Sequence, residues 1–108
     1  MSNYNLALNS TAPEILERLA GDEDRDVRWC VAFNRNTLPE TLRHLANDES
    51  STVRANVAIN HNTLPETLAR LANDKFWFVR HYVARNPSTQ QYLKDYLKIR
   101  EFLNPYGL

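Results

Sequence analysis

Hydrophobic residues recur along this chain at the spacing of short amphipathic helices. One set, with positions one, three or four residues apart, predicts the buried stripe of a first helix: Leu38, Leu42, Leu45 and Ala46. A second set a few residues later predicts the buried side of another helix: Val53, Val57 and Ala58. The pattern therefore predicts an all-α fold built from pairs of short helices.

The pattern repeats with a period of 26 residues. The segment NTLPETLRHLAND begins at Asn36, and NTLPETLARLAND begins at Asn62. The match continues into the second helix, where Val-Arg-x-x-Val-Ala-x-Asn starts at Val27, Val53 and Val79. We therefore predict a single domain of three two-helix repeats, over residues 10–35, 36–61 and 62–87. Residues 1–9 are interpreted as an N-terminal partial repeat, and residues 88–108 as a C-terminal capping helix without the second-helix signature.

Residues at the predicted helix ends indicate how each helix starts and stops. A Thr-x-x-Glu capping box is predicted at the start of each first helix: Thr11/Glu14, Thr37/Glu40 and Thr63/Glu66. An asparagine closes each second helix, and we assign it a capping role in preference to reading a base or a peptide: Asn34, Asn60 and Asn86. Helices of about ten residues are marginal alone, so neighbouring repeats must stabilise them.

Composition narrows the class of protein. The 108 residues are 43% hydrophobic and 24% charged, as in one folded domain, and thirteen basic residues balance thirteen acidic ones. The single cysteine, Cys30, excludes an internal disulfide and a cysteine-ligated zinc or iron–sulfur site. Only two glycines leave no glycine-rich phosphate loop. No signal peptide or membrane-spanning run is apparent, so we expect a cytoplasmic protein that does not bind membranes.

The repeated motifs resemble those of two families of helical repeats. Leu-x-x-Leu-Ala-x-Asp followed by Val-Arg-x-x-Val-Ala-x-Asn looks like the leucine-rich repeat variant, and the Asp-to-Val-Arg spacing is similar to that of HEAT repeats. The resemblance covers residues 10–86. It implies a right-handed α-solenoid with a binding surface, usually for protein and sometimes for nucleic acid, and no enzymatic activity. Some leucine-rich repeat variant proteins carry an iron–sulfur cluster, but its cysteines are absent here, so we predict no cofactor.

Two charged columns run through the repeats, with each arginine six residues after an aspartate: Asp22, Arg28, Asp48, Arg54, Asp74 and Arg80. One interpretation is a ladder of guanidinium groups that follows the phosphates of a polyanion. The interpretation that we prefer follows from the HEAT resemblance, which implies that the two columns pair into an internal ion ladder. Such a ladder holds neighbouring repeats in register.

The third repeat departs most from the others. Lys75-Phe76-Trp77-Phe78 stands where the earlier copies have Glu23-Asp24-Arg25-Asp26 and Glu49-Ser50-Ser51-Thr52. Exposed aromatic residues of this kind usually mark an interface. Two interpretations are open: the C-terminal cap covers these residues through Tyr92, Tyr96 and Phe102, or a partner or second copy of the chain does so.

Charge is divided between the two ends. Residues 75–100 contain six basic residues and one acid, whereas residues 1–34 contain six acids and three basic residues. We predict a protein-interaction surface on the third repeat: Phe76, Trp77, Phe78, Arg80, His81 and Arg85. The alternative partner is a nucleic acid bound to the basic half. A homo-oligomer is a further possibility, through the aromatic loop or through head-to-tail pairing of the charged ends.

No catalytic or metal-binding residues are predicted. His44, His61 and His81 occupy different repeat columns, and no nucleophile or metal-ligand spacing links them. Cys30 shares its column with Asn56 and Tyr82, which indicates a partly buried packing residue. The sequence therefore favours a binding protein over an enzyme.

Overall fold

Residues 2–104 are described by a computed structural model, in which they form eight α-helices and no strand. The helices are α1 (Asn3–Asn9), α2 (Pro13–Leu19), α3 (Arg25–Phe33), α4 (Pro39–Leu45), α5 (Ser51–Ile59), α6 (Pro65–Leu71), α7 (Trp77–Arg85) and α8 (Gln91–Leu103). The prediction of an all-helical fold is confirmed. Residues 105–108 of the predicted cap, and residue 1 of the predicted partial repeat, lie outside the described residues.

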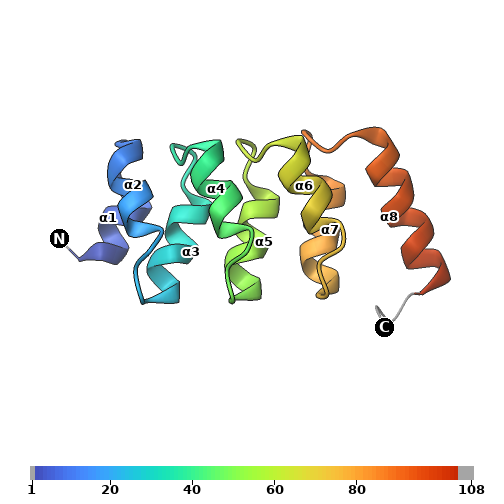
Figure 1. The fold of residues 1–108 in the computed structure, drawn as a ribbon, viewed down its shortest axis with the longest axis horizontal. Coiled ribbons are helices and arrows are strands. Elements are labelled where there is room, and N and C mark those ends of the chain that lie inside the picture. Colours follow the sequence, from blue (N-terminus) through green and yellow to red (C-terminus); the bar gives the residue numbers. More distant parts are fainter. Residues whose placement is uncertain (1, 105–108) are drawn as a thin grey trace.

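The helices follow one another along the longest dimension of the molecule, from α1 at one end to α8 at the other (Figure 1). Its extents are 47 × 23 × 16 Å. Helices α1, α3, α5 and α7 pack side by side, and α2, α4 and α6 each pack against the helix that follows them in the chain. Helix α8 packs on α7. Contacts therefore connect mainly neighbours in this series.

The core lies between the two sets of helices. Leu16, Leu42 and Leu68 from α2, α4 and α6 are fully buried. The predicted buried positions Val53, Val57 and Ala58 are confirmed, as are Leu42, Leu45 and Ala46.

Leu38 is a wrong prediction, because it is 46% exposed. It precedes Pro39, which is in the first turn of α4, and its backbone is extended. Proline disfavours helical backbone in the residue before it, so Leu38 lies outside the helix and not on its buried stripe.

The predicted capping boxes are also wrong. Helices α2, α4 and α6 begin at a proline, and none receives a side-chain cap. The Thr37 hydroxyl instead donates to the carbonyl oxygen of Val31 at 2.6 Å, and Thr63 donates to Val57 in the same way. Each buried threonine therefore satisfies a carbonyl in the last turn of the preceding helix, where no intrahelical donor remains.

The asparagines do end the second helices, but not in the predicted left-handed conformation. Asn34, Asn60 and Asn86 all have extended backbone. The buried Asn60 amide donates to the carbonyl oxygens of Ala32 at 2.9 Å and Asn34 at 3.1 Å, and its side-chain oxygen accepts from the backbone N–H of Asn62. These side chains thus join adjacent second helices by hydrogen bonds to backbone that would otherwise be buried without partners.

We predict that Asn34→Ala lowers the free energy of unfolding by about 3 kcal/mol, because it removes several partners of buried backbone groups. The Asn34 amide donates to Ala7 and Ser10 at 2.9 Å, and its oxygen accepts from Asn36 at 2.8 Å. Urea denaturation followed by circular dichroism measures the change. The control is Asn36→Ala, an exposed position where we expect a change below about 0.5 kcal/mol. Equal effects of the two substitutions would contradict this role for Asn34.

Candidate binding site between helices α7 and α8

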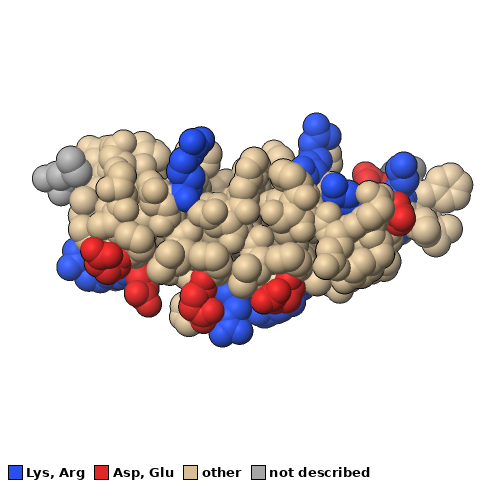
Figure 2. All heavy atoms as spheres, turned by 90° about the horizontal axis from the view of Figure 1, so that it is seen from above, with Lys and Arg blue, Asp and Glu red and all other residues tan. Residues whose placement is uncertain are grey.

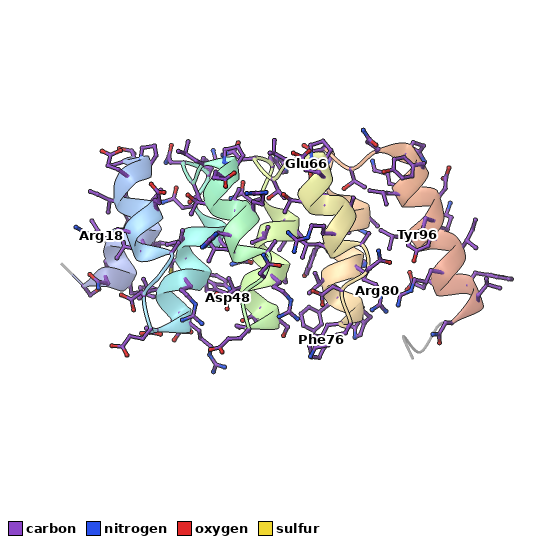
Figure 3. All side chains as sticks on the ribbon, in the orientation of Figure 1. Arg18, Asp48, Glu66, Phe76, Arg80 and Tyr96 are labelled. Carbon is purple, nitrogen blue, oxygen red and sulfur yellow. The ribbon has the colours of Figure 1, made fainter. Side chains whose placement is uncertain are left out.

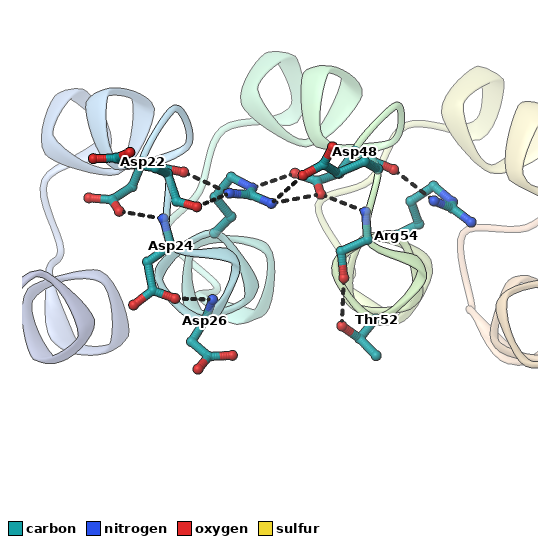
Figure 4. A network of polar contacts seen from close by, with 10 residues as sticks. Asp22, Asp24, Asp26, Asp48, Thr52 and Arg54 are labelled. Carbon is teal, nitrogen blue, oxygen red and sulfur yellow. Dashed lines mark hydrogen bonds and ion pairs between the residues drawn. The ribbon is translucent and has the colours of Figure 1, made fainter.

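Two buried arginines connect successive turns between helices (Figure 4). The Arg28 Nε donates to Asp48 at 2.8 Å, and its Nη1 donates to the backbone carbonyl of Asp22 at 2.8 Å. Arg54 repeats both bonds, to the Asp74 carboxylate at 2.7 Å and to the Asp48 carbonyl at 2.7 Å. Each guanidinium therefore holds the aspartate six residues before it by the backbone and the aspartate 20 residues after it by the carboxylate.

The first arginine in this column has a favourable electrostatic environment. The hydrogen bond to Asp48 raises the pKa of Arg28, and this effect outweighs the opposing effect of burial. The side chains on both sides of the Arg28–Asp48 and Arg54–Asp74 pairs are almost fully buried. A guanidinium in such a place needs an anion as its partner, because burial removes the water that would otherwise solvate its charge.

Arg80 is the third arginine in the column and has no such anion. Its Nη1 donates to the Asp74 carbonyl at 2.7 Å, which repeats the backbone half of the pattern. Twenty residues after Arg80, however, the chain has Arg100 and not an aspartate. Arg80 is only 9% exposed, and among residues 2–104 it forms no ion pair within 4.0 Å. Burial lowers the pKa of Arg80, and the charge of Arg100 lowers it further.

Helix α8 explains why the aspartate is missing. The helices α2, α4 and α6 stop after seven residues, and the turn that follows carries Asp22, Asp48 or Asp74. Helix α8 instead continues for 13 residues, so position 100 lies inside a helix. In the view of Figure 1, the C-terminal end of α8 leans away from α7. Phe102 and Leu103 at that end are largely exposed.

A pocket of about 300 Å³ lies between α7 and α8. Its apolar walls include Trp77, Ala84 and Leu97. Its basic residues are Arg80, Arg85, Lys94, Lys98 and Arg100, and Glu101 is the acid that lines it. Figure 3 shows Arg80 on the side of α7 that faces α8. The Nη1 atom of Arg100 is buried and, among the described residues, has no hydrogen-bond partner.

The structure separates the three neighbouring aromatic residues. Phe76 is the residue before α7, and Arg54 and Lys75 lie near its ring, with centroid distances of 5.8 and 5.5 Å. Phe78 packs against the core. Trp77 is 62% exposed and lies edge-on to His81, with 6.1 Å between ring centroids. The alternative in which the cap covers Trp77 is therefore wrong, and Tyr92, Tyr96 and Phe102 are themselves exposed.

Of the six residues predicted for the interaction surface, the pocket brings together Trp77, Arg80, His81 and Arg85. Phe76 lines a different, shallow groove, together with Tyr4 and Trp29. Sequence reasoning missed Arg100, Lys98 and Leu97 as part of the same site. The signal for Arg100 was present, since it stands 26 residues after Asp74 in the aspartate column.

The remaining candidate residues do not gather into a reactive site. His44, His61 and His81 are all exposed, as predicted. Across residues 2–104, no three His, Cys, Asp or Glu side chains are grouped so that they could hold a metal ion. Cys30 is fully buried, and burial raises the pKa of its thiol. The thiol is therefore more deeply buried and less reactive than an exposed cysteine would be.

Comparisons with protein-family models, curated proteins and solved structures find no match for this chain. The resemblance to helical repeats therefore rests on the motifs in the sequence alone. In the part of the chain that the structure describes, no helix has both the length and the apolar character needed to cross a membrane.

We predict that Asp74→Asn lowers the free energy of unfolding by about 3 kcal/mol, because it leaves the buried Arg54 guanidinium without its anion. The matched control is Glu40→Gln, which neutralises a carboxylate that pairs with Arg43 on the surface. That change should cost less than about 1 kcal/mol. Chemical denaturation measures both, and a similar small cost for the two substitutions would contradict a structural role for the buried pair.

Proposed function

We propose that this chain is a non-enzymatic protein-interaction module built as a right-handed α-solenoid. In this proposal, residues 10–35, 36–61 and 62–87 are three repeats similar to the leucine-rich repeat variant and to HEAT repeats. The recurrence of the same side-chain bonds supports the proposal. Asn60 and Asn86 donate to carbonyls 26 and 28 residues earlier, and Arg28 and Arg54 bind carboxylates 20 residues later.

The recognition surface lies at the α7–α8 end. The single observation that carries this proposal is the exposure of Trp77 at the pocket between the two helices, beside buried Arg80. Tryptophan and arginine supply much of the binding energy in protein interfaces, because they combine a large apolar area with directed hydrogen bonds. A large aromatic side chain left in water next to such a pocket gains most when another protein covers it.

A protein fits this surface better than a nucleic acid. In the view of Figure 2, side chains of both signs gather along one long edge, and much of the surface facing the viewer is uncharged. A nucleic acid requires a basic track that follows its backbone over several phosphates. The basic residues here gather in one pocket, which suits a single anionic group of a partner. A cytoplasmic location is part of the proposal and is supported by the low cysteine content.

We predict that Trp77→Ala weakens partner binding at least tenfold, the effect of about 2 kcal/mol that is typical of a central aromatic residue. The matched control is Tyr92→Ala on α8, because Tyr92 is also 62% exposed but does not line the pocket. Quantitative affinity capture from lysate of the source cells, with mass spectrometry, compares both variants with the natural chain.

The expected result is that one set of proteins binds the natural chain and Tyr92→Ala but not Trp77→Ala. Circular dichroism checks that both variants fold. If Trp77→Ala retains every partner of the natural chain, the recognition surface lies elsewhere and the proposal is wrong.

A further inference from the structure

The Arg80 guanidinium is oriented for a carboxylate that residues 2–104 do not supply. In Arg54, the Nη1 bond to the Asp48 carbonyl fixes the guanidinium, and Nε and Nη2 then donate to the two carboxylate oxygens of Asp74. Arg80 makes the equivalent Nη1 bond to the Asp74 carbonyl at 2.7 Å. Its Nε and Nη2 donate to no carboxylate of the described chain. The backbone half of the binding arrangement is therefore complete, and the anionic half is vacant of any side chain.

Arg100 adds a second guanidinium to the same pocket. Its Nη1 is buried without a hydrogen bond among the described residues, although a buried donor of this kind is costly to leave unpaired. Arg80 and Arg100 carry like charges, and each makes the environment of the other less favourable. An anion between them relieves the repulsion and satisfies donors on both side chains.

We propose that Arg80 and Arg100 together bind one carboxylate group from an acidic segment of a partner protein. This inference rests on the proposed function and names the ligand of the same surface. The partner's carboxylate takes the place that Asp74 holds beside Arg54 and Asp48 holds beside Arg28. Trp77 and Leu97, which also line the pocket, pack against the apolar neighbours of the acidic residue.

The pocket favours a protein carboxylate over a phosphate. Its template within the same molecule is a carboxylate, bound through Nε and Nη2. Glu101 also lines the pocket, and its charge opposes a doubly charged phosphate more than a singly charged carboxylate. The apolar walls suit a folded or extended peptide segment, whereas a nucleic acid backbone offers mainly charged and polar atoms.

Two labelled peptides test the ligand class. One alternates leucine with aspartate and glutamate, and its counterpart carries asparagine and glutamine in place of the acids. Fluorescence polarisation measures affinity, and the Nε–Hε resonance of Arg80 in NMR spectra reports contact at the pocket. The acidic peptide should bind and shift the Arg80 resonance, and the amide peptide should do neither. Equal binding of the two peptides, or acidic-peptide binding that leaves the Arg80 resonance unmoved, overturns the proposal.

Arg100→Asp separates loss of binding from loss of folding. The new carboxylate stands in the aspartate column and supplies Arg80 with an internal anion, so the thermal midpoint should rise by about 4 °C. At the same time, affinity for the acidic peptide should fall more than about tenfold. The matched control is Lys98→Asp, which makes the same change in charge at an exposed residue lining the same pocket. It should weaken binding by less than about threefold.

Other occupants give different results. A single-stranded oligonucleotide that binds more tightly than the acidic peptide assigns the pocket to phosphate and overturns the proposal. A dimer of the natural chain that Arg100→Asp dissociates, seen by analytical ultracentrifugation, assigns the pocket to a second copy and also overturns it. If Trp77→Ala loses its partners while Arg100→Asp keeps them, the interaction surface stands and only the carboxylate site is wrong.

Discussion

A buried guanidinium requires an anion beside it, and this requirement connects the structure of the molecule to its proposed function. Arg28 and Arg54 meet the requirement within the chain, through Asp48 and Asp74. Both pairs join segments 20 residues apart, so the same interaction that neutralises a buried charge also joins consecutive helix pairs. Arg80 is buried in the same way and lacks the anion, because α8 continues as a helix where the earlier helices end in a turn.

Buried polar groups play a similar part in the rest of the core. Helices of seven and nine residues are too short to persist alone, and each leaves backbone groups unpaired at both ends. Thr37 and Asn60 supply partners for these groups from neighbouring segments. The apolar side chains provide the area buried between helices, and the polar side chains determine which carbonyls and N–H groups meet.

The helices and their buried positions could be predicted because they follow from local spacing in the sequence. Roles that depend on a partner in space were harder to predict. Thr37 has the same motif whether its hydroxyl accepts from its own helix or donates to the preceding one, and the sequence does not show which group lies within reach. The carboxylate that binds Arg28 lies in the next turn and not six residues earlier. Arg100 escaped notice because its helix lacks the turn that marks the aspartate column.

The departure of the last helix from the pattern of the others is therefore the basis of the proposed binding site. A double-mutant cycle tests this account most directly, by comparing Arg54→Met with Asp74→Asn and Arg80→Met with Arg100→Met in urea denaturation. The account predicts a stabilising coupling energy of about 1 to 3 kcal/mol for Arg54 with Asp74, and a coupling of opposite sign for Arg80 with Arg100. A coupling of zero between Arg80 and Arg100, or one of the same sign as the first pair, would contradict it.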